Sequence, residues 1–380
     1  MKPKFIPARF RNQAMGATLV SALFVSFSDS SQASDWNGST SSDWNTTTNW
    51  SFGAVPADNA VINTTTPNIA KITAALAATP LDILIGSGTS VTGRLDHVSG
   101  AAANAANRSM ILGNTGGGSS GTFNLADTSS AGGGVSGFAQ GSGSMTIGGG
   151  PSNNGNLIAG DFAGSTGTVN VNTSGSLVVT NDIFIGRGSS TAVGVMNLEN
   201  GAVTAGAVGN GCWVAFGRSG GNGTLNMSGG SIISYGSMYF PRDSGSTGLC
   251  NMSGGTLDCR DGTFAVADGG TGTFNMTGGT IQTNGREFWV GNWGGGGGNG
   301  SFNFSAGSIN VGSWVAIGRD GGTGNFNMTG GTFTKTGNGT QFIVGASGPG
   351  TMTQSAGLVD VQQGYTWVGE AGGATTATYT

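Results

Sequence analysis

A short phrase centred on asparagine recurs along this chain, and the repeat constrains the fold more than any other feature. Its clearest copies run over residues 223–232, 272–281 and 324–333, the second of which reads GTFNMTGGTI. Successive central asparagines are 27, 29, 25, 24, 28 and 24 residues apart, and they are Asn170, Asn197, Asn226, Asn251, Asn275, Asn303 and Asn327. Asn124 precedes Asn170 by 46 residues, which predicts two coils there, with residues 145–147 in the additional one.

Each period contains three candidate strands separated by glycine-rich turns. In the first, alternation places Phe274 and Met276 on one side and Asn275 on the other. The second is short, as in residues 308–311, and the third ends in glycine, as in residues 214–217. A β-propeller repeat is longer and carries four strands. The pattern therefore predicts an all-β, single-stranded parallel β-helix of about 25 residues and three strands per coil, which we expect to be right-handed.

Composition limits the classes of function. Glycine accounts for 76 of the 380 residues and charged residues for 8%. So much glycine with so little charge suggests a disordered linker, but the apolar residues alternate as in buried strands. Without residues 1–33 the chain has 10 basic and 17 acidic residues, a net charge of −7. A nucleic-acid partner is not expected, because it requires a basic surface.

The first 33 residues have the features of a signal peptide. Lys2, Lys4, Arg9 and Arg11 precede an apolar stretch over residues 14–27, and small residues follow at 31–33. A membrane anchor or a buried first helix is the alternative. No later apolar run is long enough to cross a bilayer. We therefore expect export to the outer cell surface or the extracellular space.

The remaining chain divides into two parts. Residues 34–60 contain Trp36, Trp44 and Trp50 in a polar stretch. Since an exposed first coil would present an open strand edge, this segment is interpreted as an aromatic-rich N-terminal cap. Residues 61–380 form the β-helix repeats. They stop in the middle of a coil, which suggests a truncated C-terminus.

One combination of motifs resembles a known group of proteins. It comprises Trp44-(four residues)-Asn49-Trp50-(five residues)-Pro56-Ala-Asp58, third strands ending in Ile-Gly, and coils of the GTFNMTGG type. The chain resembles the autotransporter-associated β-strand repeat proteins and secreted bacterial β-helix proteins with a PEP-CTERM sorting tail. That resemblance implies a large surface or secreted protein, and thus a structural or adhesive role.

Evidence for catalysis or metal binding in the sequence is slight. A charged patch of Arg242, Asp243, Asp261 and Asp268 could bind uronates or act catalytically, but such turn residues usually pair locally in solvent. We expect no enzyme activity and no cofactor. The three cysteines and the single histidine do not match a zinc pattern, so no metal is expected. A bond between Cys250 and Cys259 is left open.

Two outward rows are candidates for binding. Because alternate residues of a strand face the same side, the sequence places a stripe of aromatic residues on the outward face of the third strands. Its candidate ligand-binding residues are Trp213, Tyr239, Trp289, Trp314 and Trp367. Either outer loops cover this stripe, or it binds pyranose rings of a polysaccharide or another cell-surface component. The asparagine row is either a ladder of amides bonded to one another or a flat surface for sugars or ice.

Overall fold

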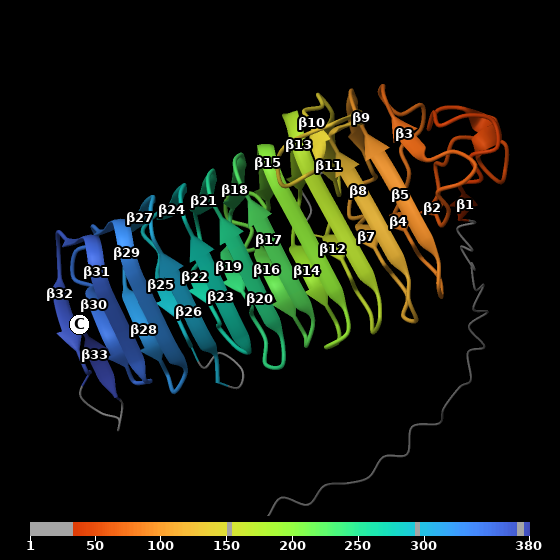
Figure 1. Ribbon diagram of the computed structural model, residues 1–380. Coiled ribbons are helices and arrows are strands. Elements are labelled where there is room, and N and C mark those ends of the chain that lie inside the picture. Colours follow the sequence, from red (N-terminus) through yellow and green to blue (C-terminus); the bar gives the residue numbers. More distant parts are fainter. Residues whose placement is uncertain (1–32, 150–153, 293–296, 371–375) are drawn as a thin grey trace, which may run out of the picture. The chain divides into compact units, whose positions relative to one another are not determined.

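The computed structural model describes residues 33–149, 154–292, 297–370 and 376–380. These residues form 33 β-strands and one 3-10 helix, η1 (Thr47–Asn49), with no α-helix among them. The strands stack as parallel coils in chain order (Figure 1), which confirms the predicted parallel β-helix. The predicted signal peptide lies outside the described residues except for Ala33. In the described part of the chain, no helix is long and apolar enough to span a bilayer.

The third strands of successive coils form one continuous parallel sheet of 13 strands, the third strand row. In order, these are β1 (Ser34–Asp35), β2 (Ala60–Ile62), β4 (Ile83–Ile85), β7 (Met110–Leu112), β12 (Leu157–Ala159), β14 (Ile183–Arg187), β16 (Trp213–Arg218), β19 (Ser237–Phe240), β22 (Phe264–Val266), β25 (Phe288–Val290), β28 (Val315–Arg319), β30 (Gln341–Ala346) and β32 (Tyr365–Val368).

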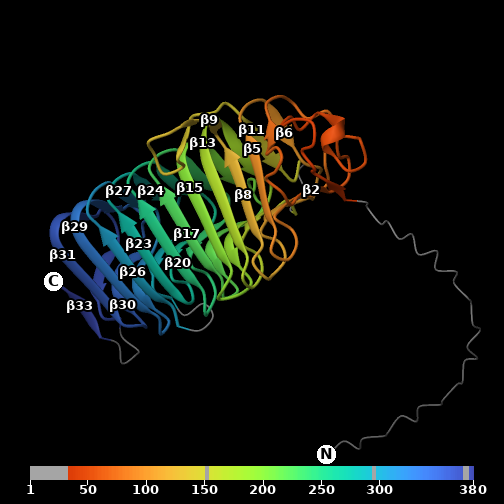
Figure 2. The same cartoon turned by 45° about the vertical axis from the view of Figure 1, so that its right-hand side comes forward.

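The first and second strand rows lie on the other faces of the solenoid (Figure 2). The first row contains β3 (Ala70–Ile72), β5 (Thr92–His97), β8 (Ser120–Leu125), β13 (Thr166–Val179), β15 (Val193–Ala205), β17 (Asn222–Met227), β20 (Thr247–Met252), β23 (Thr271–Met276), β26 (Asn299–Phe304), β29 (Thr323–Lys335), β31 (Gly350–Val361) and β33 (Ala377–Tyr379). The second contains β6 (Ala101–Ala103), β11 (Ser144–Ile147), β18 (Ser231–Ser234), β21 (Thr256–Cys259), β24 (Thr280–Thr283), β27 (Ser308–Val311) and the ends of β13, β15, β29 and β31.

The predicted additional coil between Asn124 and Asn170 is wrong. Asn124 pairs directly with Asn170, and β11 is the second strand of the same coil, paired with β6 and β13. The additional length is used by an antiparallel hairpin of β9 (Asp127–Ala131) and β10 (Phe138–Ala139). Residues inserted between strands need not form a coil, because only the strands must remain in register.

The core is the space enclosed by the three rows. The inward residues of the first row, such as Phe274, Met276 and Phe302, are fully buried. The rings of Phe274 and Phe302 stack at 4.7 Å between centroids. Parallel pairing brings equivalent side chains of successive coils into contact, so each coil buries the inward row of its neighbours.

The tryptophans of the 34–60 segment lie at one end of this core. Trp36, Trp44 and Trp50 are 3%, 0% and 1% exposed. The Trp50 ring is edge-on to both others, at centroid distances of 5.1 and 4.7 Å. Its indole N–H donates to the carbonyl of Trp44 at 2.8 Å. The three rings therefore pack against one another and belong to the same buried apolar cluster as the inward residues of the coils.

The three cysteines are free thiols in this structure, so the Cys250–Cys259 bond left open by the sequence is not formed. All three are buried. Burial raises the pKa of Cys212 to about 11 and that of Cys259 to about 12. They serve as small apolar core residues.

Glycine at the end of a third strand is required by close approach between coils. Gly291 has φ +71°, and a Cβ there would lie 2.0 Å from the carbonyl oxygen of Thr323 in the next coil. Gly245, in an outer turn, has a similar φ of +73° but has open space around its Cβ position. Both positions share the left-handed backbone conformation, but only Gly291 has a neighbouring atom that a Cβ would meet. A comparison of the two therefore separates the cost of the conformation from the cost of the steric contact.

We predict that Gly291→Ala destabilises the protein more than Gly245→Ala. The Gly245 change adds only the left-handed backbone cost, about 1 kcal/mol, whereas the Gly291 change also forces two coils apart, for a total of about 2–4 kcal/mol. Urea unfolding of both variants measures this. Equal losses would contradict the steric role of Gly291.

Candidate functional site

The outward face of the third strand row carries the aromatic stripe. Pairing places one residue of each strand in a single row, as parity predicts: Ile158, Phe184, Ala215, Tyr239, Ala265, Trp289, Ala316, Ile343 and Trp367. From Phe184 to Ala316, large aromatic residues alternate with alanine. Neighbouring strands are only about 4.8 Å apart, so each alanine leaves room for the ring of the adjacent coil.

Arginine side chains cover much of this stripe. The guanidinium of Arg218 lies 4.1 Å from the ring centroid of Phe184 and 4.8 Å from that of Trp213. Arg242 lies 4.1 Å from Trp213 and 5.6 Å from Tyr239. Phe184 is 2% exposed and Tyr239 is 9% exposed. Cations and rings thus alternate through three coils, held by cation–π attraction and by burial of the arginine stems.

Carboxylates hold these arginines in place. Asp243 forms ion pairs with Arg242 and, at 3.7 Å, with Arg218. Asp182, whose pKa is raised by burial, accepts the backbone N–H of Trp213 at 2.7 Å. The aromatic residues predicted as a binding platform around Trp213 and Tyr239 are therefore packed under a network of charged side chains. Arg218, the last residue of β16, and Arg242, in the turn after β19, provide this cover.

The predicted charged patch is only partly assembled. Arg242, Asp243 and Asp268 follow strands of the third row, and burial raises the pKa of Asp268, which also accepts the amide N–H of Asn292 at 2.6 Å. Asp261 precedes β22, whereas Asp268 follows it, so they lie at opposite ends of one strand. The patch does not bring these carboxylates together.

Three further tryptophans of this outer face are only partly buried. Trp289 is half-buried, and its indole N–H donates to Glu287 at 2.8 Å. Arg319 bonds the same carboxylate at 2.8 Å and lies 4.3 Å from the indole centroid. Trp314 is half-buried beside Ala316 and Ile343. Trp367, in β32, is 39% exposed.

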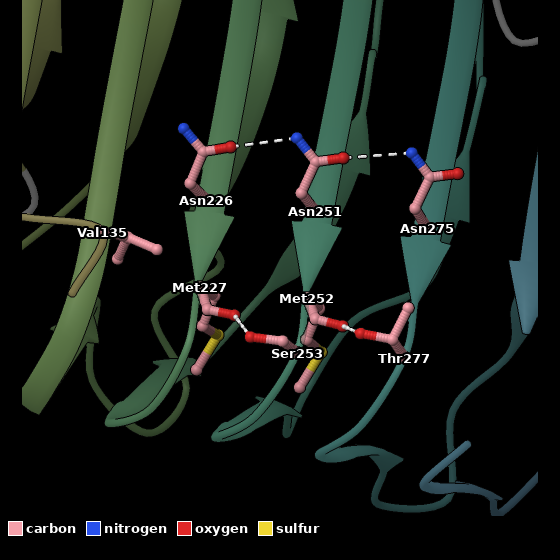
Figure 3. A pocket seen from close by; sticks show the side chains of 8 residues that line it. All are labelled: Val135, Asn226, Met227, Asn251, Met252, Ser253, Asn275 and Thr277. Carbon is pink, nitrogen blue, oxygen red and sulfur yellow. Dashed lines mark hydrogen bonds between the residues drawn. The ribbon is translucent and has the colours of Figure 1, made fainter. Parts of the chain in front are cut away.

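The asparagine row forms a hydrogen-bonded ladder from Asn124 to Asn303, which agrees with the first interpretation of the sequence. Figure 3 shows three of its amides, Asn226, Asn251 and Asn275. Each amide Nδ2 donates to the Oδ1 of the preceding coil, at 2.7 to 3.0 Å, through Asn170, Asn197, Asn226, Asn251, Asn275 and Asn303. A shallow hollow of about 350 Å³ lies over three of these amides, with Val135 of the hairpin loop beside it.

The ladder begins at a buried carboxylate. Asn124, whose Oδ1 accepts the bond from Asn170, donates to Asp96 at 2.7 Å. Arg94 and Thr128 donate to the same carboxylate. Because every amide points its N–H group toward Asp96, the positive ends of the side-chain dipoles face the anion. These amides bind one another along the stack.

Comparisons with known proteins leave the site to be interpreted from geometry. No protein-family model, curated protein or solved structure matches the chain. Among the described residues, no group of three histidine, cysteine or acidic side chains is placed to hold a metal ion.

The role of the arginines was missed in the sequence, although a signal exists. Arg187, Arg218 and Arg319 each end a third strand, directly after a glycine. A cation at a fixed distance from a row of aromatic residues indicates stacking over that row. Considered singly, each arginine has the appearance of a solvated turn residue.

We predict that Arg218→Ala lowers the free energy of unfolding by about 1–2 kcal/mol, because two ring faces lose their cation and their cover. Arg108→Ala is the matched control. Arg108 is 45% exposed and contacts Asp82 at 3.5 Å, so its loss should cost less than about 0.5 kcal/mol. Urea unfolding measures both. Equal effects would show that the stack adds nothing beyond a surface ion pair.

Proposed function

We propose that this chain is an exported, non-enzymatic β-solenoid that acts as a structural or adhesive component of the bacterial cell surface or extracellular matrix. The observation that carries the proposal is the asparagine ladder. Its repeated polar side chains bond to one another from coil to coil, at 2.7 to 3.0 Å. The repetition thus serves cohesion along the axis.

The charged groups support the same conclusion. Glycoside hydrolysis requires two carboxylates that face each other across a substrate. Asp243 is engaged by two arginines, Asp268 is 6% exposed and bonded to Asn292, and Asp261 lies at the other end of the strand. This arrangement favours a rigid scaffold over a catalytic centre.

The extended architecture fits a stalk or matrix element. Thirteen strands of the third row, at about 4.8 Å per coil, give a rod of about 60 Å. The signal-peptide features of residues 1–33 and the resemblance to autotransporter-associated repeat proteins support export to the cell surface.

Expression of the full chain in a Gram-negative host tests the proposal. We expect cleavage after Ala33, detected by mass spectrometry of the new N-terminus, and protein outside the cytoplasm. A chain lacking residues 1–33 should remain inside. Beads coated with the exported protein should be retained on a bacterial cell layer, and beads coated with heat-unfolded protein should not.

An enzyme assay tests the part of the proposal that says the protein is not an enzyme. The exported protein, incubated with polygalacturonate, should release no reducing ends and no unsaturated uronates above buffer. Products formed by the native chain and lost in Asp243→Ala would overturn the non-enzymatic proposal. Uncleaved protein confined to the cytoplasm would overturn the proposed location.

A further inference from the structure

A cleft beside Trp289 interrupts the covered outer face of the third strand row. It has a volume of about 450 Å³, within the range of small-molecule sites. We call it the Trp289 cleft, and its polar lining includes Ser237, Thr263, Asp261, Arg286, Glu287 and Arg319. Nothing in the scaffold role requires such a hollow.

Small residues in one outward row create the cleft. In each coil this row lies two residues before the aromatic stripe. It contains Trp213, which pairs with Ser237, and Trp314, which lies two residues before Ala316. Between these two tryptophans, the equivalent positions are Ser237, Thr263 and Glu287. Two hydroxyl side chains therefore stand where neighbouring coils place large rings, which leaves a recess with a polar floor.

Trp289 forms an apolar wall that is held rigidly. Its indole N–H is bonded to Glu287 and its ring is contacted by Arg319, so the side chain is fixed before any ligand arrives. A fixed aromatic wall lowers the entropic cost of binding. Aromatic side chains with polar groups around them suit the apolar C–H faces and the hydroxyl edges of pyranose rings.

Asp261 and Arg286 have hydrogen-bonding groups that remain available to a ligand. Both are exposed, and among the described residues neither side chain forms a hydrogen bond or a salt bridge, in contrast to Glu287 and Arg319, which bond each other at 2.8 Å. A carboxylate accepts and a guanidinium donates several hydrogen bonds. The pair can thus both accept hydrogen bonds from and donate them to the hydroxyl groups of a sugar.

The charges indicate an uncharged ligand. Two carboxylates, Asp261 and Glu287, and two guanidinium groups, Arg286 and Arg319, line the cleft, so its formal charge is zero. A carboxylated sugar would meet Asp261 without a net positive field to offset the repulsion. Neutral hydroxyl groups have no such penalty.

The site extends beyond one sugar ring. Asp261 and Arg286 also line an adjoining hollow of about 420 Å³, which adds Tyr235 and Val208. Val208 is 80% exposed. Two hollows, each with an aromatic side chain and sharing one pair of charged residues, fit successive units of a chain.

We propose that the Trp289 cleft and its neighbour bind a neutral oligosaccharide, with Trp289 as the apolar wall and Asp261 and Arg286 as ligands for its hydroxyl groups. This binding site goes beyond the scaffold role and is separable from it. A rigid exported solenoid without sugar affinity would still satisfy the function proposed above.

Isothermal titration of the full chain tests the proposal with four probes: cellotetraose, laminaritetraose, mannotetraose and tetragalacturonate. We expect at least one neutral tetrasaccharide to bind with a Kd below about 1 mM, and tetragalacturonate to bind at least about 10-fold more weakly than that sugar. Asp261→Asn and Arg286→Gln should each weaken the neutral sugar by about 10-fold or more.

Two exposed residues outside the cleft provide matched controls. Asp35→Asn and Arg108→Gln change the same chemical groups, and their Kd should equal that of the native chain. Melting curves of all four variants should agree closely, since each changed side chain is at the surface. The proposal is overturned if no neutral probe binds, if tetragalacturonate binds best, or if the cleft variants bind like the controls.

Discussion

In-register parallel pairing of each coil with the preceding one is the interaction on which the rest of the structure depends. It brings Phe274 over Cys250 and under Phe302, and Asn275 between Asn251 and Asn303. One coil alone would expose its inward row and leave its strand edges unpaired. Stacking solves both problems at once, because neighbours supply the hydrogen-bond partners and the apolar contacts.

The same spacing determines what each outward row can contain. Small amides repeat in the successive coils of the first row from Asn124 to Asn303, where they bond at 2.7 to 3.0 Å. Inside the solenoid, rings of successive coils stack on one another, as Phe274 and Phe302 do. On the outward face of the third row, aromatic residues instead alternate with alanine, and arginines pack over the rings. Where the flanking row has Ser237 and Thr263 instead of tryptophan, the surface opens into the Trp289 cleft.

Much of this arrangement could be predicted from the sequence, because strand parity is a local property. The buried Phe274 and Met276, the asparagine row and the stripe from Phe184 to Trp367 follow from alternation and from the repeat. The coil between Asn124 and Asn170 was wrong, since chain length does not distinguish an inserted hairpin from an additional coil. The arginine cover over Trp213 was missed, because it depends on side-chain placement across coils. The separation of Asp261 from Asp268 was missed although both residues flank the single strand β22, because the predicted patch grouped them by charge and not by their position relative to that strand.

The central claim is that register between coils, and nothing about coil length itself, holds the fold together. Insertion of one glycine after Gly248, within β20, should reverse the inward and outward faces of residues 249–252 and abolish cooperative unfolding. One glycine inserted after Gly245, in an outer turn with open space around it, should leave the melting temperature within a few degrees of the native value. Thermal unfolding followed by circular dichroism measures both. Similar melting temperatures for the two insertions, or loss of folding on the turn insertion alone, would contradict the account.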